Sequence, residues 1–391
     1  RTTTNDGNGN DDDRRRQHDH DDAATRSGRR RKQPRHLLVF PSECNFGGDR
    51  PENTAAVLRA ARDSGRWYTM LDIAKHAATD RVHLNRLDPD FAALSFYKLF
   101  GDPTGVGALL VRRTAAGVLL EQRGECERRG EHGGECNGER ECNCNCKHRR
   151  HYQGGGSVDI MLPNRDYTVP KSSTNNSGLD SLTSGTSNFR GIANLHHGFD
   201  VLDSLGGMSA IHKHAFCLAK ELTRRLKGMK HANGMPVVAI YCGWNDDDAA
   251  AGWGNGDGNG ESSGGGKKRG RKRGPTVALN VFRSDGTAVG YNEVSKLAAL
   301  ARTPMQFRTG CFCNPGACQK ALNLNDREVI DNYESTGHVC GDHIDLVNGM
   351  PTGAIRVSFG KDSIWEDLDV FVRFLEATFR NNNNNNNNNN D

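Results

Sequence analysis

The stretch SFYKLFGDPTGVGALLVRR, from Ser95 to Arg113, joins two apolar runs through a glycine-rich turn. Its first residues end a predicted strand over 92–96, and its last residues contain a second predicted strand over 107–111. In open α/β sheets, ligands bind where strands reach their carboxyl ends. Lys98, directly after the first of these strands, is therefore a candidate for chemistry.

The regions on either side alternate short apolar runs with longer segments of helical period. Strands are predicted at 37–40 and 68–71, with a helix at about 54–64 as the crossover that parallel strands require. Further predicted elements are helices at about 188–204, 208–228 and 364–379, and strands at about 236–242, 276–282 and 354–359. The order predicts an α/β fold with a largely parallel sheet, followed by a smaller α/β C-terminal domain.

The helix at 208–228 has a clear apolar stripe. One face carries Ile211, Ala215, Leu218, Leu222 and Leu226. This spacing predicts that the helix packs against a core.

Four stretches are too biased in composition to join a packed core. Residues 1–36 and the asparagine tail 381–391 are expected to be disordered. The Cys-rich stretch 121–151 and the Gly-rich, basic stretch 245–275 are expected to be surface inserts. The predicted domains are therefore a partial large domain over 37–205 and a small domain over 206–380, each with one insert.

Charge and hydropathy favour a cytoplasmic protein. The formal net charge of +4 is small for 391 residues, and the strongest basic run, Lys267 to Arg273, is expected to be a solvated loop. No apolar stretch approaches membrane-spanning length, and no signal peptide is visible. We expect neither a nucleic acid nor a membrane as partner.

Twelve cysteines occur, of which five lie in the insert 121–151. In a chain of this length they are expected to be thiols rather than a disulfide framework. The CNCNC run with nearby Cys136 and His148 contains soft metal ligands, but its spacing does not match the paired CxxC of structural zinc sites. No metal site is predicted.

A second charged residue stands at a strand end. The predicted strand 68–71 runs into Asp72, and an amine and a carboxylate at one sheet edge suit a pyridinium cofactor. Pyridoxal 5'-phosphate (PLP) needs a lysine for its Schiff base and an acid that keeps its ring nitrogen protonated. Lys98 and Asp72 meet those needs, although such pairs also occur on ordinary surfaces.

The string from Ser95 to Arg113 resembles the lysine segment of class V aminotransferases and cysteine desulfurases. Those families usually carry His before the lysine, and Tyr97 at that position resembles the molybdenum cofactor sulfurases. The resemblance implies a type I PLP-dependent transferase fold. It also implies that Lys98 is catalytic and binds the cofactor together with Asp72 and Ser95.

A second string, FRTGCFCNPGACQ from Phe307 to Gln319, holds three cysteines in a short polar loop. A loop thiol near cationic groups is easily deprotonated. The string resembles the Arg-x-Gly-x-x-Cys segment of cysteine desulfurases, which implies that Cys313 is the nucleophile, with Cys311 as the competing candidate. A zinc loop made of Cys311, Cys313 and Cys318 is the non-catalytic alternative.

The third string runs from Gly337 to Gly360, GHVCGDHIDLVNGMPTGAIRVSFG. The resemblance implies that Arg356 binds the substrate carboxylate, which a guanidinium fork matches through two hydrogen bonds. A strand-edge arginine in a salt bridge is the alternative. The run around Cys340 and Asp342 resembles molybdenum cofactor sulfurases more than ordinary desulfurases.

Two weaker signals complete the candidate site. Asn45, in PSECNFGG, resembles a family asparagine beside the cofactor ring, and Thr186 resembles a threonine that reaches the cofactor phosphate across a dimer interface. The alternative for both is a turn or helix cap.

The resemblance covers about 37–113, 152–243 and 276–380. It implies desulfuration of L-cysteine, a persulfide, and sulfur transfer to the molybdenum cofactor of hydroxylases such as xanthine dehydrogenase and aldehyde oxidase, by a homodimer. Family members have a further N-terminal part with a phosphate-binding loop and a C-terminal cofactor-binding domain, and neither is recognised here. The alternatives are a general cysteine desulfurase for iron–sulfur or tRNA sulfur supply, and a non-catalytic scaffold.

Overall fold

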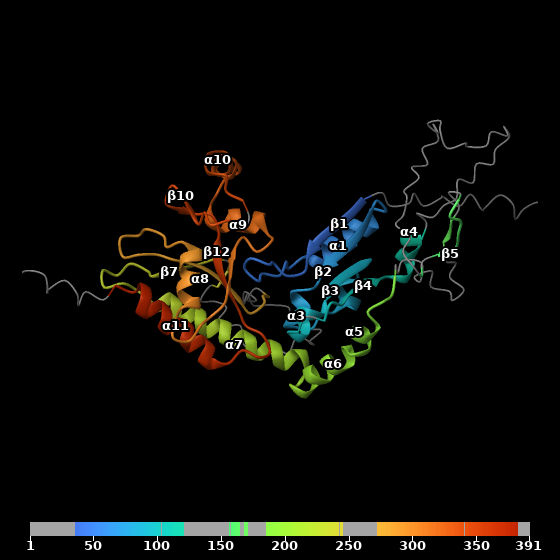
Figure 1. Cartoon of the computed structure of the whole chain (residues 1–391), viewed down its shortest axis with the longest axis horizontal. Coiled ribbons are helices and arrows are strands. Elements are labelled where there is room, and N and C mark those ends of the chain that lie inside the picture. Colours follow the sequence, from blue (N-terminus) through green and yellow to red (C-terminus); the bar gives the residue numbers. More distant parts are fainter. Residues whose placement is uncertain are drawn as a thin grey trace, which may run out of the picture.

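The computed structural model describes residues 36–102, 104–120, 156, 158–164, 168–170, 185–241, 243–244, 272–339 and 341–381. Two four-stranded sheets dominate this part of the chain, and Figure 1 shows them side by side with the long helix α7 (Gly207–Gly228) below. Two small two-stranded sheets complete the strand inventory of the described residues.

The first sheet has the order β1-β2-β3-β4, built from β1 (His36–Pro41), β2 (Trp67–Asp72), β3 (Phe91–Ser95) and β4 (Gly107–Val111). The pairs β1–β2 and β2–β3 are parallel, which confirms the predicted parallel-rich sheet. β4 pairs antiparallel with β3. The link between them is only α3 (Phe96–Phe100) and a short turn, too short for the crossover that a parallel pair requires.

Helix α1 (Thr54–Asp63) is the predicted crossover between β1 and β2. It buries Leu58 against Leu71, Ile73 and Ala92, which form one cluster with partly buried side chains of the sheet and of residues 82–87. This packing fixes the first sheet, and with it the carboxyl ends of β1, β2 and β3.

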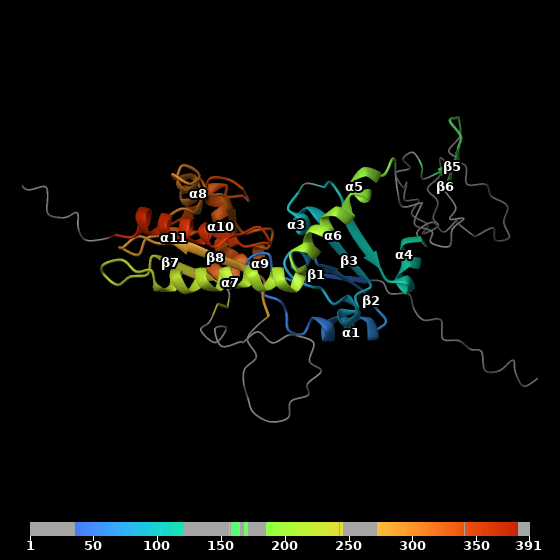
Figure 2. The same ribbon diagram turned by 90° about the horizontal axis from the view of Figure 1, so that it is seen from below.

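The second sheet has the order β7-β8-β12-β9 and is antiparallel at every pairing. Its strands are β7 (Val238–Tyr241), β8 (Thr276–Val281), β12 (Ala354–Ser358) and β9 (Arg308–Gly310). α7 and α11 (Trp365–Phe379) pack with β8 into the largest described core cluster, and Figure 2 shows these three elements together. The predicted stripe of α7, from Ile211 to Leu226, is buried at all five positions.

The other helices and strands are short, and most of them connect or flank the two sheets. They are η1 (His76–Ala78), α2 (Leu84–Leu87), η2 (Arg113–Ala115), α4 (Ala116–Leu120), β5 (Val158–Met161), β6 (Thr168–Pro170), α5 (Phe189–Ala193), α6 (Leu195–Ser204), α8 (Tyr291–Ala299), α9 (Pro315–Leu322), α10 (Asp326–Thr336), β10 (Leu346–Val347) and β11 (Met350–Pro351). The single helix predicted at 188–204 is thus two helices, divided at Asn194.

The end of the predicted basic insert is not a surface loop. Arg273 is only 2% exposed. Its guanidinium lies 3.9 Å from the Trp244 ring and donates a hydrogen bond of 2.6 Å to the main-chain oxygen of Gly47. The expectation of a solvated run was wrong here, because this arginine joins the loop after β1 to the second sheet.

Most of the biased sequence lies outside the described residues. This applies to residues 1–35, to both inserts except the last residues of 245–275, to the CNCNC run and to the tail beyond Asn381. The domain division at residue 205 stays a prediction. In the part that the structure describes, no helix combines the length and apolar character needed to span a membrane.

Candidate active site at the junction of the two sheets

The predicted amine and carboxylate follow adjacent parallel strands. In the β2–β3 register, Asp72 lies opposite Ala93, two residues before Ser95, and α3 then carries Lys98. Asp72 is half-buried and its Oδ1 accepts a hydrogen bond of 2.9 Å from the main-chain nitrogen of Ala74. Lys98 is exposed, and none of the contacts of the described residues joins its Nζ to Asp72. Their joint action on one cofactor ring stays a prediction.

The loop after β1 brings Asn45 to this edge. Because β1 and β2 are parallel, both chains leave the sheet on the same side, and the nitrogen of Ser42 donates 2.9 Å to the main-chain oxygen of Asp72. Gly48 has φ +80°, and a Cβ there would come within 3.1 Å of Thr276. The loop therefore needs glycine at this position to approach the second sheet.

Arg356 comes from the second sheet and contacts this loop. Its Nη1 donates a hydrogen bond of 2.8 Å to the main-chain oxygen of Asn45, and its guanidinium carbon lies 4.8 Å from the centre of the Phe312 ring. β12 lies between β8 and β9, so the alternative of a strand-edge arginine is wrong. Burial, followed by the charge of Arg308, lowers the pKa of Arg356. Its Nε is buried and makes no hydrogen bond within the described chain.

The cysteine loop follows β9. Phe312 and Cys313 both have left-handed backbone angles, φ 56° and 57°, a conformation that costs energy for residues other than glycine. Asn314 stabilises the turn, since its Oδ1 caps α9 at Ala317 and its Nδ2 donates 3.3 Å to the Cys44 sulfur. The loop thus presents Cys313 as an exposed thiol beside the Asn45 loop.

The other two cysteines of this loop form a disulfide, Cys311 to Cys318. This corrects the expectation that all cysteines are thiols. It also removes the basis for a three-cysteine zinc loop, and it leaves Cys313, not Cys311, as the free thiol of the string.

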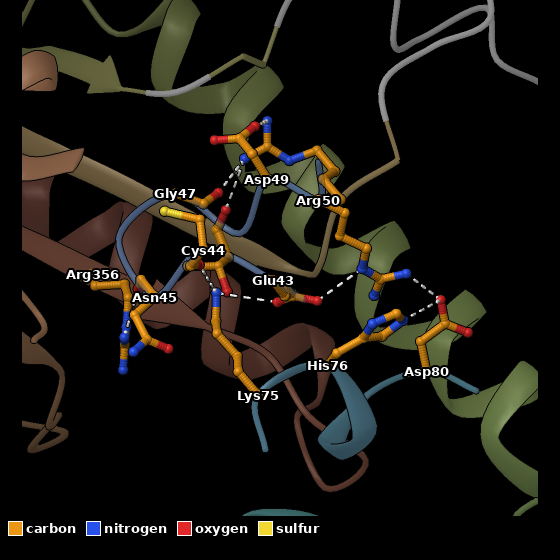
Figure 3. Close-up of polar contacts among 12 residues, drawn as sticks. Glu43, Cys44, Asn45, Gly47, Asp49, Arg50, Lys75, His76, Asp80 and Arg356 are labelled. Atoms are coloured by element: carbon orange, nitrogen blue, oxygen red, sulfur yellow. Dashed lines mark hydrogen bonds and ion pairs between the residues drawn. The ribbon is translucent and has the colours of Figure 1, made fainter. Parts of the chain in front are cut away.

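A buried charged group that the sequence analysis missed supports the Asn45 loop (Figure 3). Glu43 is 1% exposed, and its carboxylate lies 3.1 Å from Lys75 Nζ and 2.9 Å from Arg50 Nε. Lys75 also donates 2.8 Å to the main-chain oxygen of Cys44. The sequence carried a signal for this charged group, because polar residues come directly at the ends of both strands. They stand in SEC after β1 and in DIAK at the end of β2.

The electrostatics of this group favour its charged state. Burial by itself raises the pKa of Glu43, but Lys75 and Arg50 bring that pKa below its ordinary value. Burial lowers the pKa of Lys75, and Glu43 opposes this shift. A buried ion pair of this kind keeps its two residues in a fixed arrangement, because removing either charge would leave the other uncompensated.

The group continues toward α7. Arg50 pairs with Asp80, which lies 4.0 Å from His76 and 3.7 Å from His212. Burial and the charge of Arg50 lower the pKa of His76 to about 4. Burial likewise lowers the pKa of His212, so both imidazoles are neutral at pH 7.

Two remaining predicted positions lie outside this contact network. Thr186 is exposed in the turn before α5. Asp342 accepts hydrogen bonds from the nitrogens of Val339 and Ile344 and lies 3.0 Å from His338, which gives it a role in its own turn. Cys340 lies outside the described residues.

The junction therefore gathers an arginine with a free buried N–H, an asparagine, a buried acid–lysine pair and an exposed thiol. Lys98 and Asp72 follow neighbouring strands at the same edge of the first sheet. A free amine, a carboxylate and an unpaired guanidinium N–H are the groups that PLP and an amino-acid carboxylate require. The residues present fit that cofactor.

No protein-family model matches the chain. The chain is similar to curated proteins named molybdenum cofactor sulfurase. It is 35% identical over 362 residues to that of Bos taurus, which covers 91% of this chain and 35% of the relative. It is 36% identical over 355 residues to that of Arabidopsis thaliana, which covers 88% of this chain and 36% of the relative. The chain thus spans about a third of the length of the curated relatives it matches.

Solved structures of cysteine desulfurases share the fold. The Escherichia coli cysteine desulfurase CsdA superimposes with a TM-score of 0.53 at 16% identity, over 88% of this chain and 58% of that one. The apo cysteine desulfurase of Thermococcus onnurineus gives 0.53 at 18% identity, over 87% of this chain and 59% of that one. The predicted PLP-dependent transferase fold is therefore confirmed.

Proposed function

Since the chain is homologous to molybdenum cofactor sulfurases and has the fold of cysteine desulfurases, we propose that it takes sulfur from L-cysteine and holds it as a persulfide on Cys313. The observation that carries the proposal is the hydrogen bond of 2.8 Å from Arg356 to Asn45, beside the loop of Cys313. It brings residues of three separate strings together at the loop that follows β1.

Arg356 is the proposed site for the substrate carboxylate. Its guanidinium is partly withdrawn from water, and Nη1 is already committed to Asn45, while the buried Nε is unpaired. A carboxylate that accepts from the remaining N–H groups would satisfy this buried donor. A substrate that carries a carboxylate, such as L-cysteine, would therefore suit this position.

PLP is the proposed cofactor, with Lys98, Asp72, Asn45, Ser95 and Thr186 as the residues that would hold it. When bound, it supplies the sink for electrons released at the substrate α-carbon. The chain's own part is acid–base chemistry, in which Lys98 Nζ takes the α-proton. Asp72 is a half-buried carboxylate at the end of β2, and its negative charge would stabilise a protonated ring nitrogen.

The sulfur step assigned to Cys313 is balanced without an external oxidant. The Cys313 thiolate attacks the substrate sulfur, the new S–S bond forms, and the substrate C–S bond breaks with its electron pair kept by carbon. A proton then completes alanine. One L-cysteine and one protein thiol thus give one alanine and one protein persulfide. An exposed thiol suits this task, because the persulfide must reach an acceptor.

The proposed acceptor is the molybdenum cofactor of hydroxylases such as xanthine dehydrogenase and aldehyde oxidase. The name of the relatives supports this choice. A general cysteine desulfurase would also release alanine, so alanine formation does not separate the two functions. The sulfur acceptor does separate them: the persulfide form of the protein should restore activity to a sulfur-depleted molybdenum hydroxylase. If it instead served only iron–sulfur or tRNA thiolation systems, the acceptor assignment would be wrong.

The test uses the full chain supplied with PLP and L-cysteine. Alanine and protein-bound sulfane sulfur should form in equal amounts, and borohydride reduction should fix PLP to Lys98, as read by peptide mass. Lys98→Ala should abolish both, whereas Lys320→Ala, an exposed lysine on α9, should change neither. Wild-type protein that gives no alanine and no labelled lysine would leave a non-catalytic scaffold as the function.

A further inference from the structure

Helix α6 carries three metal-ligating side chains on one side. His196, His197 and Asp200 are all exposed, and their ligand atoms lie within 4.8 Å of one another. The two imidazole rings are 3.7 Å apart between centroids. None of these residues takes part in the candidate active site described above.

The spacing on the helix is what makes the three groups converge. Residues four and three apart face the same side of an α-helix, so Asp200 is adjacent to both His196 and His197. Tetrahedral zinc with ligand distances near 2.1 Å needs its ligand atoms roughly 3.3 Å apart. Rotation of the exposed side chains of His197 and Asp200 would close the remaining gap.

A main-chain contact orients the ring of His196. Its Nδ1 lies 2.6 Å from the main-chain oxygen of Ala193, the last residue of α5. A carbonyl only accepts, so Nδ1 is the donor, and Nε2 is the ring nitrogen that a metal ion would use. Histidines that bind metals are oriented in the same way, with the other ring nitrogen donating to a carbonyl or carboxylate. The contact with Ala193 thus orients the ring of His196 before any ion binds.

The face that carries these ligands is independent of the substrate site. Gly198 of α6 packs on Phe100 of α3, where an added Cβ would come within 2.7 Å of the ring. Helical spacing puts His196 and Asp200 on the side opposite Gly198. An ion there would connect the end of α5 to the first turn of α6 without touching α3.

We propose that His196, His197 and Asp200 form a binding site for a divalent cation of the zinc class, with water as the fourth ligand. Two imidazoles and one carboxylate are the donor set that zinc accepts in open sites. The ion stiffens the α5–α6 turn, which leads back to the segment of Thr186.

The test is a Co²⁺ titration of the full, untagged chain after its thiols have been blocked with iodoacetamide, so that the cysteine-rich insert cannot compete. Visible absorption bands of bound Co²⁺ should saturate at one ion per chain, and Zn²⁺ should displace them. His197→Gln and Asp200→Asn should each weaken binding at least tenfold, because a lost ligand costs at least as much as a lost residue that only orients a ligand. His343→Gln, an exposed histidine elsewhere, should bind as the wild type does.

The proposal is overturned if the blocked wild type shows no saturable band, or if His197→Gln and Asp200→Asn bind as tightly as the wild type. Circular dichroism of each variant must match that of the wild type. Loss of the desulfurase activity proposed above would not affect this result, because the readout is binding of the metal alone.

Discussion

The guanidinium of Arg356 and the main-chain oxygen of Asn45, 311 residues apart in sequence, are joined by a hydrogen bond of 2.8 Å. The bond links the central region of the second sheet to the loop after the first strand of the first sheet. A residue from near the end of the chain thereby contacts a loop from near its beginning, and this contact is one of several that hold the candidate active site together.

Arg356→Lys is expected to lower kcat/KM for L-cysteine at least tenfold, mainly through KM. Lysine keeps the positive charge but lacks the planar fork that can bind Asn45 and a carboxylate together. Steady-state alanine formation measures the effect. Arg373→Lys on the exposed side of α11 is the matched control, and equal kinetics in the two variants would contradict the assignment.

Alkylation should distinguish the cysteines of the 311–318 loop. Without reductant, iodoacetamide is expected to modify Cys313, which is exposed, and to leave Cys311 and Cys318 unmodified, because these two form a disulfide. With reductant and denaturant present before labelling, all three should be modified, because Cys318 is buried in the folded protein. Peptide mass spectrometry gives the answer, and labelled Cys311 in the unreduced sample would show that the pair is open in solution.

Glu43→Gln is expected to destabilise the fold by about 3 kcal/mol, because it leaves Lys75 and Arg50 buried without their shared carboxylate. Urea unfolding followed by circular dichroism measures the free energy. The control is Glu221→Gln, whose partners Arg224 and Arg225 are far more exposed, and a loss of no more than about 1 kcal/mol is expected there. Similar losses in the two variants would argue against a structural role for the buried group.

Stability should fall as the pH is lowered from 7 to 5. The pKa of His76 is about 4 in the folded protein, against 6.5 for the free side chain. The unfolded state therefore binds a proton in this window while the folded state does not, and about 2 kcal/mol should be lost. His212 shifts in the same direction and adds to the loss. The carboxylates of Glu43 and Asp80 have lowered pKa values, so their contributions are lost only at lower pH.

His76→Asn tests the source of this pH dependence. It should flatten the change in unfolding free energy between pH 7 and pH 5, whatever its effect at pH 7. Asn85→Ala, at an exposed position that carries no titrating group on the same connection, serves as the control and should keep the wild-type slope. An unaltered slope in His76→Asn would mean that other groups titrate in this window.

Gly198→Ala is expected to destabilise the fold by roughly 1–3 kcal/mol, because the new Cβ would overlap the ring of Phe100. The same change at Gly228, the last residue of α7, meets no atom within 4 Å and should be neutral or stabilising by up to about 1 kcal/mol. Thermal unfolding compares the two. If both variants melted like the wild type, α6 would not be packed on α3 as described.

The local pattern of the chain predicted much of the fold. The strands that end at Asp72 and Ser95, the crossover helix at 54–63 and the apolar stripe of α7 all follow from the period of apolar residues. Such patterns are local, because a strand or helix must bury its apolar side whichever neighbour covers it. The motifs around Lys98 and Cys313 could likewise be recognised from the sequence.

What the sequence alone did not decide was which residues meet. Glu43 and Lys75 are 32 residues apart, and nothing in either segment identifies the other as its partner, yet tertiary packing places their charges 3.1 Å apart. Arg273 reads as part of a basic loop but is buried against Trp244. Cys311 and Cys318 read as free thiols but are bonded. The apolar pattern was enough to predict the helices and strands, because backbone periodicity is local. The charge partners and the candidate site came from the folded chain, because burial and pairing depend on residues brought together from distant parts of the sequence.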